Sequence, residues 1–219
     1  MHKYEAVIFD LDGTLLDTLE DLADSVNAAL KVYNCPQKSL EQVRMYVGNG
    51  IRNLMKRAVE GGEEHPQFEA IFEAFKEHYQ KNSKNKTKPY DGIMEVVSKL
   101  YAQGIKLAIV SNKADFAVKE LSPYYFDKYF MAAIGEREGI ARKPAPDTVF
   151  QAAKELGVDL DKAVFIGDSD VDADTAKNAG IPCIGVLWGF RDKELLQEHG
   201  VKYFAETPME ILKILEEMQ

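Results

Sequence analysis

The sequence predicts an α/β protein built on a doubly wound parallel sheet, and three observations lead to this fold class. Short apolar runs rich in Val, Ile, Phe and Tyr alternate along the chain with amphipathic helix patterns, an order that indicates βαβ units. The runs are continuously apolar, as expected for parallel strands buried on both faces. Polar motifs directly follow several of the runs, at the strand ends where ligand sites of open α/β sheets lie.

The predicted strands and helices follow one another in a regular order. Amphipathic helices are indicated between the strands, one of them after the second acidic cluster and ending before Gly180. Residues 91–104 carry apolar side chains at helical spacing, and Gly104 suits the position just after a helix. Residues 146–157 begin with Pro and end with Gly, which is the asymmetry that helices favour. The runs expected to be strands are residues 4–9, 105–110, 129–134, 163–166 and 181–186.

One stretch, residues 17–88, interrupts the alternation because it shows helix patterns and no convincing strand. Two apolar stripes with helical spacing occupy it. They are Leu19, Leu22, Ala23, Val26, Ala29, Leu30 and Tyr33, and then Phe68, Ile71, Phe72, Phe75 and Tyr79. We therefore expect residues 1–16 and 89–219 to form an α/β catalytic core, and residues 17–88 to form an inserted α-helical cap.

Composition and charge argue against several classes of partner. Of the 219 residues, 27 are Lys or Arg and 36 are Asp or Glu, which gives a net charge of −9. This balance disfavours a nucleic-acid surface or attachment to an anionic membrane. We expect no signal peptide, because the first apolar run is short and ends at Asp10. Cys35 and Cys183 lie far apart without metal-ligand spacing, so we expect a cytoplasmic protein; a monomer and a homodimer both stay open.

The first chemical motif is Asp10-Leu11-Asp12-Gly13-Thr14, directly after the first run. Asp10 and Asp12 are two residues apart, so in an extended segment both side chains point to one face. An ionised aspartate can attack phosphorus without an adjacent base and form an aspartyl-phosphate. We expect Asp10 to attack, and Asp12 to protonate the leaving alkoxide and later deprotonate water. Taken alone, the motif is also typical of a turn.

A second acidic cluster follows residues 163–166 and supports the catalytic interpretation. It contains Asp168, Asp170, Asp172 and Asp174. Hard oxygen ligands with room for water and phosphate suit Mg²⁺. A helix N-terminus enriched in acids is the alternative. A calcium loop is excluded, because that loop needs Gly at its sixth position and Glu at its twelfth, where this chain has Ala173 and Ala179.

Two further segments offer groups that bind phosphate. Ser111 and Asn112 end the run of residues 105–110, where a hydroxyl and a backbone N–H can hold phosphate oxygens. Lys143 precedes Pro144, and its charge can offset that of the attacking aspartate and of the transferring phosphoryl group. For each segment alone, a turn, a helix cap or a surface lysine is an adequate explanation. Their order along the chain makes the pattern specific.

These motifs, in this order, resemble those of the haloacid dehalogenase superfamily, and the resemblance covers essentially the whole chain. It implies that Asp10 is the nucleophile and that Asp10 and Asp168 bind Mg²⁺ through their side chains. It implies that Asp12 is the acid/base residue and a metal ligand through its backbone carbonyl, and that Asp172 supports the metal shell. Dehalogenases lack the aspartate that stands here as Asp12, and P-type ATPases have Thr there, so phosphatases and phosphomutases remain.

The resemblance also implies that Ser111, the backbone of Asn112 and Lys143 form a phosphate cradle. The helical insertion resembles the cap of the phosphoglycolate phosphatase-like group. Three phrases also resemble that group: Val47-Gly48-Asn49-Gly50 with Leu54, Val110-Ser111-Asn112-Lys113, and Arg142-Lys143-Pro144-Ala145-Pro146.

The function implied is a Mg²⁺-dependent phosphatase of a small phosphorylated metabolite, with 2-phosphoglycolate as the leading candidate. Asn49 and Arg52 are the candidate substrate-binding residues of the cap; the alternative for Arg52 is an ordinary solvated helix residue. A phosphosugar mutase of the β-phosphoglucomutase type, and a pyrophosphatase or nucleotidase of the same fold, remain alternatives. A non-enzymatic regulatory protein is disfavoured because every chemical position is filled.

Overall fold

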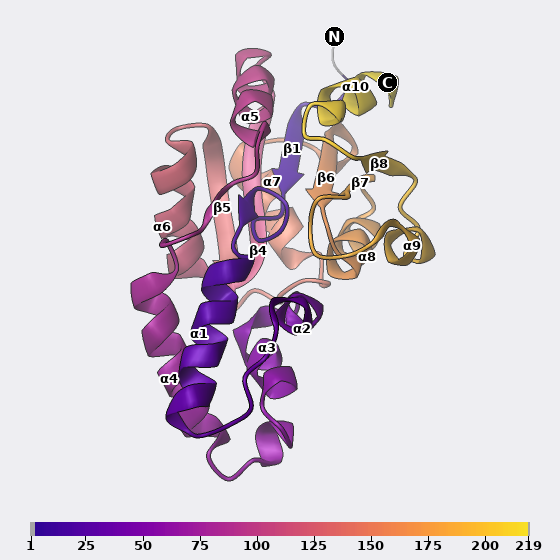
Figure 1. Cartoon of the computed structure of the whole chain (residues 1–219). Coiled ribbons are helices and arrows are strands. Elements are labelled where there is room, and N and C mark those ends of the chain that lie inside the picture. Colours follow the sequence, from indigo (N-terminus) through magenta and orange to yellow (C-terminus); the bar gives the residue numbers. More distant parts are fainter. Residues whose placement is uncertain (1–2, 219) are drawn as a thin grey trace. The chain divides into compact units, whose positions relative to one another are not determined.

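The computed structural model describes residues 3–218, and they form two compact units (Figure 1). Unit 1 comprises the chain up to Leu16 and again from Pro89 onward, and unit 2 is Asp17–Lys88. Two short strands, β2 (Leu16–Asp17) and β3 (Lys88–Pro89), pair where the chain leaves and re-enters unit 1. Unit 1 is therefore discontinuous in sequence, whereas unit 2 is one continuous segment.

Unit 1 is built on a six-stranded sheet with the order β5-β4-β1-β6-β7-β8. Each pairing in this sheet is parallel, and the order changes direction at the centre, as in doubly wound folds. The predicted α/β class is thus confirmed. The strands are β1 (Ala6–Phe9), β4 (Lys106–Ala114), β5 (Phe130–Glu136), β6 (Ala163–Gly167), β7 (Cys183–Val186) and β8 (Tyr203–Ala205).

Most strands begin or end at other residues than expected, and the short strands β2, β3 and β8 were not predicted. The strand expected over residues 105–110 continues as β4 through Ser111 and Asn112 to Ala114, with a register shift against β5 after Val110. The edge strand β8 was not predicted from the sequence, because three residues are too few to carry a strand pattern. It forms because Tyr203 continues the ladder next to Ile184 of β7.

Helices cover both faces of the sheet, and alternate residues of each strand serve the two layers. On β1, Val7 and Phe9 pack into one cluster, whereas Ala6 and Ile8 pack into the other. The first cluster takes side chains from α5, α6 and α10, and the second from α7 and α8. The helices are α5 (Ile93–Ala102), α6 (Asp115–Phe126), α7 (Asp147–Leu156), α8 (Asp170–Ala179), α9 (Lys193–Glu198) and α10 (Glu210–Glu217), with a 3₁₀ turn η2 (Leu160–Lys162).

Unit 2 is helical. Its helices are α1 (Leu19–Val32), α2 (Leu40–Tyr46), α3 (Gly50–Ala58) and α4 (Phe68–Asn82), with a 3₁₀ turn η1 (Gly62–Glu64). Most of the stripe predicted on α1 and all of that predicted on α4 are buried. The buried carboxylate of Asp21 accepts hydrogen bonds from the backbone N–H groups of Lys86 and Thr87, and so fastens the end of the unit to α1. Between residues 3 and 218, no helix has the length and apolar character needed to cross a bilayer.

Candidate active site

The three central strands, β4, β1 and β6, bring the predicted motifs to one edge of the sheet. Asp10 directly follows β1, and its backbone N–H donates a 2.9 Å hydrogen bond to the carbonyl of Ile166 on β6. Asp168 directly follows β6, and Ser111 and Asn112 lie in the second half of β4. Residues far apart in the sequence therefore converge because the strands are parallel neighbours.

Three of the predicted metal ligands form a cluster. Carboxylate oxygens of Asp10, Asp168 and Asp172 all lie within 4.8 Å of one another, and all three residues are buried. Buried carboxylates at this spacing repel one another unless a cation compensates them. Three hard oxygen donors are the ligand chemistry that suits Mg²⁺. The residues present therefore fit the predicted metal. Asp12 lies outside this side-chain cluster.

Lys143 supplies a positive charge inside the cluster. Its Nζ lies 2.7 Å from Oδ1 of Asp10 and 2.6 Å from Oδ1 of Asp172, and its side chain is only 3% exposed. Burial by itself lowers the pKa of the Lys143 ammonium, but the two carboxylates outweigh it and raise that pKa above its ordinary value. Burial raises the pKa of Asp10 well above its usual range, opposed by Lys143 and reinforced by Asp172 and Asp168. Lys143 thus opposes the rise in the pKa of Asp10 and holds its Oδ1 in place.

Asp168 is held by donors from two distant segments. Thr14 Oγ1 donates to its Oδ1 at 2.9 Å, and the backbone N–H of Phe190 donates to its Oδ2 at 2.8 Å. Burial, together with nearby Asp172, raises the pKa of Asp168 to about 7 despite these bonds. Space around the carboxylate is tight: a Cβ on Gly13, whose φ is +92°, would lie 2.5 Å from Asp168 Oδ2. Gly13 therefore serves both the turn and the close approach of the two motifs.

Asp172 is fixed at the first turn of α8. Ser169 is the N-cap residue: its Oγ accepts from the Asp172 N–H, and Asp172 Oδ2 accepts from the Ser169 N–H in return. The other oxygen, Oδ1, stays with Lys143. The neighbouring acids turn elsewhere, since Asp170 lies 3.5 Å from Arg191 and Asp174 lies 3.0 Å from the ring of His199. Of the acidic residues on α8, Asp172 therefore faces Lys143, whereas Asp170 and Asp174 contact other residues.

Asp12 is paired with Lys113, which the sequence-based reasoning did not single out as a site residue. Lys113 Nζ lies 2.9 Å from Oδ1 and 3.1 Å from Oδ2 of Asp12. The Lys113 side chain is 5% exposed and that of Asp12 is 17% exposed. The carboxylate of the predicted acid/base residue therefore forms an ion pair with a nearly buried ammonium.

Ser111 and Asn112 lie on β4, and Asn112 contacts the loop that carries Lys143. The Asn112 side chain donates from Nδ2 to the backbone carbonyl of Lys143 at 3.0 Å, and so holds the lysine loop against the strand. Its Oδ1 is buried and has no hydrogen-bond partner within residues 3–218. Ser111 Oγ accepts from the Lys113 N–H at 3.2 Å. The Lys143–Pro144 peptide bond is cis.

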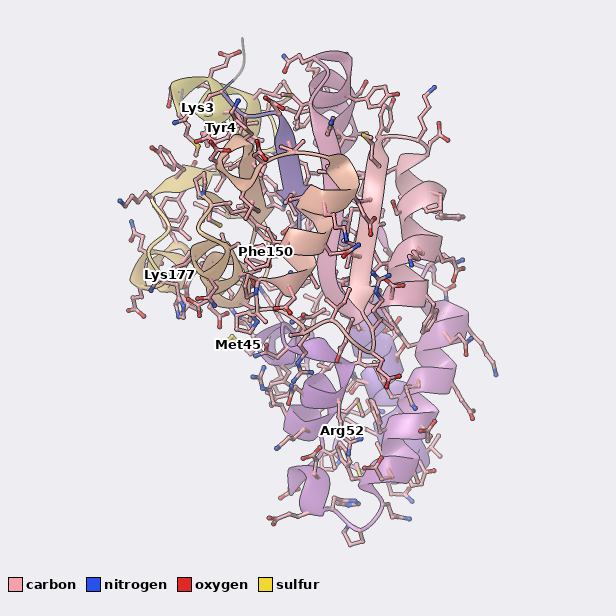
Figure 2. All side chains as sticks on the ribbon, turned by 180° about the vertical axis from the view of Figure 1, so that it is seen from behind. Lys3, Tyr4, Met45, Arg52, Phe150 and Lys177 are labelled. Carbon is pink, nitrogen blue, oxygen red and sulfur yellow. The ribbon has the colours of Figure 1, made fainter. Side chains whose placement is uncertain are left out.

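The two candidate substrate-binding residues of the cap lie in unit 2. Asn49 is the N-cap residue of α3, and its carbonyl accepts from the side chain of Asn53. Arg52, labelled in Figure 2, forms ion pairs with Glu63 and Glu69 and lies over the rings of Phe68 and Phe72. The guanidinium is thus already balanced by carboxylates of its own unit.

Several site residues were missed at the sequence level. Thr14 and Lys113 stand inside recognised motifs, but which distant carboxylate each would meet is not visible in local sequence. Phe190 contributes a backbone N–H, which no residue type marks. Trp188 packs against the core and donates from Nε1 to the Thr14 carbonyl at 3.0 Å; the pair Gly189-Phe190 after it could have suggested a close backbone approach.

Residues 7–186 match the profile of the haloacid dehalogenase-like hydrolases. The chain belongs to this family. Phosphoglycolate phosphatase 1 of Pseudomonas aeruginosa is 32% identical over 218 residues, which cover 97% of this chain and 77% of that protein. This haloacid dehalogenase-like hydrolase is also similar to a crystal structure of a provisionally named phosphoglycolate phosphatase from Lactobacillus delbrueckii subsp. bulgaricus. The TM-score is 0.93 and the sequence identity is 34%, and the match covers 98% of this chain and 99% of that one.

A third relative of this haloacid dehalogenase-like hydrolase has a different name. A protein of Caldanaerobacter subterraneus subsp. tengcongensis, provisionally named pyrophosphatase PpaX, is 29% identical over 97% of this chain and 95% of its own length. The family resemblance predicted from the motifs is confirmed, and with it the prediction of a phosphoric monoester hydrolase.

Proposed function

We propose that this hydrolase is a Mg²⁺-dependent phosphatase that cleaves a small phosphorylated metabolite through an aspartyl-phosphate intermediate. The arrangement of Asp10 carries the proposal. Asp10 is a buried carboxylate at the end of the central strand, with the Lys143 ammonium 2.7 Å away and two further carboxylates in the same cluster. Such a group can attack phosphorus, whereas a purely structural aspartate needs no second and third carboxylate beside it.

In the first half of the reaction, an oxygen of Asp10 forms a bond to phosphorus while the bond from phosphorus to the ester oxygen breaks. Asp12 gives a proton to the departing oxygen, so an alcohol leaves. Lys143, at hydrogen-bond distance from Asp10, keeps the carboxylate oriented and offsets the charge of the transferring group. Mg²⁺, held by Asp10, Asp168 and Asp172, would supply further positive charge toward the phosphate oxygens.

In the second half, water attacks the phosphorus of the aspartyl-phosphate and Asp12 takes the proton from that water. The bond from phosphorus to the Asp10 oxygen breaks, which releases orthophosphate and restores the carboxylate. The Ser111 hydroxyl, the backbone N–H of Asn112 and the Lys143 ammonium are proposed to hold the phosphate oxygens. Asn112 is suited to this because its side chain already fixes the Lys143 loop.

The leading substrate candidate is 2-phosphoglycolate, supported by the names of the relatives in Pseudomonas aeruginosa and Lactobacillus delbrueckii. Pyrophosphate is the second candidate, supported by the name of the relative in Caldanaerobacter. We propose unit 2 as the cap that contributes substrate contacts, with Asn49 as the candidate contact. The two free cysteines, Cys35 and Cys183, agree with the proposed cytoplasmic location.

A hydrolysis screen tests the proposal. Orthophosphate release is measured over phosphorylated metabolites, including 2-phosphoglycolate, sugar phosphates, nucleoside monophosphates and pyrophosphate, with Mg²⁺ or with a chelator. We expect release from one or a few small monoesters that disappears with the chelator. Release that persists unchanged with the chelator contradicts the metal assignment, and release from pyrophosphate alone replaces the monoester assignment.

A further inference from the structure

The second lysine of the site has no role in the proposed reaction, and its position is unusual. Lys113 is 5% exposed, and its Nζ contacts both oxygens of Asp12. Burying an ammonium is costly unless nearby groups compensate it. Lys143 already compensates Asp10 and Asp172. The site thus holds two ammonium groups, one at the nucleophile and one at the acid/base residue.

The backbone of Lys113 is fixed from several sides. Its N–H donates to Ser111 Oγ, and the next helix is anchored by Asp115, which accepts the Gly135 N–H at 3.0 Å. A Cβ on Gly135 would lie 2.5 Å from both the Lys113 carbonyl oxygen and the Asp115 Cα, so β5 packs directly against this segment. The ammonium is therefore presented from a rigid base, as a recognition group requires.

The position of Asp12 shows which part of a substrate Lys113 would meet. The side chains of Asp168 and Asp172 are 1% exposed, and that of Asp12 is 17% exposed. Asp12 is the carboxylate proposed to give its proton to the departing ester oxygen, at a hydrogen-bond distance of about 2.7 Å. The Lys113 ammonium contacts the same carboxylate, so it would meet the leaving part of the substrate that Asp12 serves.

We propose that Lys113 selects phosphate monoesters that carry a carboxylate on the carbon bearing the ester oxygen, by binding that carboxylate next to Asp12. The inference rests on the proposed function and names its substrate class. The ester oxygen and such a carboxylate are separated by one carbon atom, so one substrate can contact Asp12 with the first and Lys113 with the second. A lysine is suited to this contact because its point charge needs no planar pairing geometry.

The alternative is that Lys113 only orients Asp12, and the two roles predict different kinetics. An orienting residue affects every ester in kcat, whereas a recognition residue affects carboxylated esters in KM. The matched pair of substrates is 2-phosphoglycolate and ethyl phosphate, which differ by a carboxylate in place of a methyl group. Lys113→Gln is the variant of choice, because the amide still donates to Asp12 but carries no charge.

We expect Lys113→Gln to raise the KM for 2-phosphoglycolate about tenfold to a hundredfold, the range for loss of a charge-assisted contact. The KM for ethyl phosphate should change by less than about threefold. The variant Lys113→Arg, which keeps a positive charge, should bind 2-phosphoglycolate more tightly than Lys113→Gln does. Lys99→Met is the matched control, because Lys99 pairs with one carboxylate, Glu95, on the exposed face of α5. It should leave both substrates unchanged.

Binding gives a readout that does not depend on turnover. In the Asp10→Asn background, calorimetric titration with 2-phosphoglycolate should show the same tenfold to hundredfold loss on adding Lys113→Gln, and ethyl phosphate should show none. Lys113→Met serves in the same titration if the glutamine variant unfolds. Equal changes for both esters, or none for either, overturn the recognition role. If the wild type hydrolyses no monoester, the proposed function itself is refuted. That result is seen before any Lys113 variant is made.

Discussion

Thr14 Oγ1 donates a 2.9 Å hydrogen bond to Oδ1 of Asp168, and this bond joins the first motif of the chain to the acidic motif that follows β6. Both residues are almost completely buried. Because the acceptor is a carboxylate, the bond belongs to the stronger class, worth about 1.5–3 kcal/mol. It orients one oxygen of the three-carboxylate cluster.

Thr14→Val is expected to keep the shape of the side chain but remove this donor. Asp168 then loses an orienting bond, so the Mg²⁺ concentration for half-maximal activity should rise by roughly tenfold or more. Thr14→Ser, which keeps the hydroxyl, should stay close to the wild type. The measurement is a Mg²⁺ titration of hydrolysis for all three proteins. Identical titration curves for the valine and serine variants would show that the bond has no such role.

Asp10→Asn is expected to abolish turnover and to leave the fold intact. The amide has nearly the same shape as the carboxylate but cannot attack phosphorus. Orthophosphate release, with circular dichroism as the check on folding, decides the outcome. Mg²⁺-dependent hydrolysis at a near wild-type rate would falsify the assignment of the nucleophile.

Asp12→Asn should separate the two halves of the reaction. An aryl phosphate has a good leaving group that needs no proton, so it should still transfer its phosphoryl group to Asp10, but hydrolysis of the intermediate should slow. Rapid-mixing measurements should show a burst of the phenol followed by a weak steady state. Mass spectrometry should find phosphate on Asp10. The acid/base role is in doubt if neither the burst nor the covalent species is seen.

Asp168→Ala and Asp170→Ala form a matched pair for the metal site. Asp168 belongs to the three-carboxylate cluster, whereas Asp170 is two residues away and lies 3.5 Å from Arg191. Removal of Asp168 should raise the Mg²⁺ requirement strongly because a charged ligand is lost. Removal of Asp170 should change it little. If the two variants and the wild type need the same Mg²⁺ concentration, Asp168 is not a ligand.

Arg52→Ala tests the cap contact predicted from the sequence. Because Glu63 and Glu69 already pair with the guanidinium, we expect its loss to change kcat/KM for 2-phosphoglycolate by less than about fivefold. The effect on an aryl phosphate should be the same. Steady-state kinetics with both substrates is the measurement. A selective loss of ten- to a hundredfold for 2-phosphoglycolate would instead restore Arg52 as a recognition residue.

The convergence of Asp10 and Asp168 could be expected from the sequence, whereas their hydrogen-bond partners could not, and the reason is geometric. Asp10 and Asp168 directly follow strongly apolar runs, and parallel neighbours bring such positions together in any doubly wound sheet. Asp170 and Asp174 are four residues apart on α8 and so share one face of the helix, whereas Asp172, between them, points to the cluster. The roles of Asp168 and Asp172 were implied by the resemblance to the family, and in the structure both carboxylates lie beside Asp10.

The partners of those residues depend on tertiary packing and could not be predicted. Lys113 meets Asp12, which is distant in sequence, only because β4 continues beyond Val110. The donor at Phe190 is a backbone group, which leaves no pattern in the side chains. The short strand β8 likewise depends on the edge that β7 offers it.

The central place of β1 has a consequence for how this chain is made. Ala6 on β1 pairs with Lys106 on one side and with Ala163 on the other. At about 5–20 residues per second, the ribosome needs roughly 8 to 30 s after making β1 before β6 exists. During that time β1, which leads into Asp10, is an apolar strand without its neighbours, a state prone to aggregation. Unit 2 is continuous in sequence, so its synthesis is complete before that of β4 and β6, the two neighbours of β1.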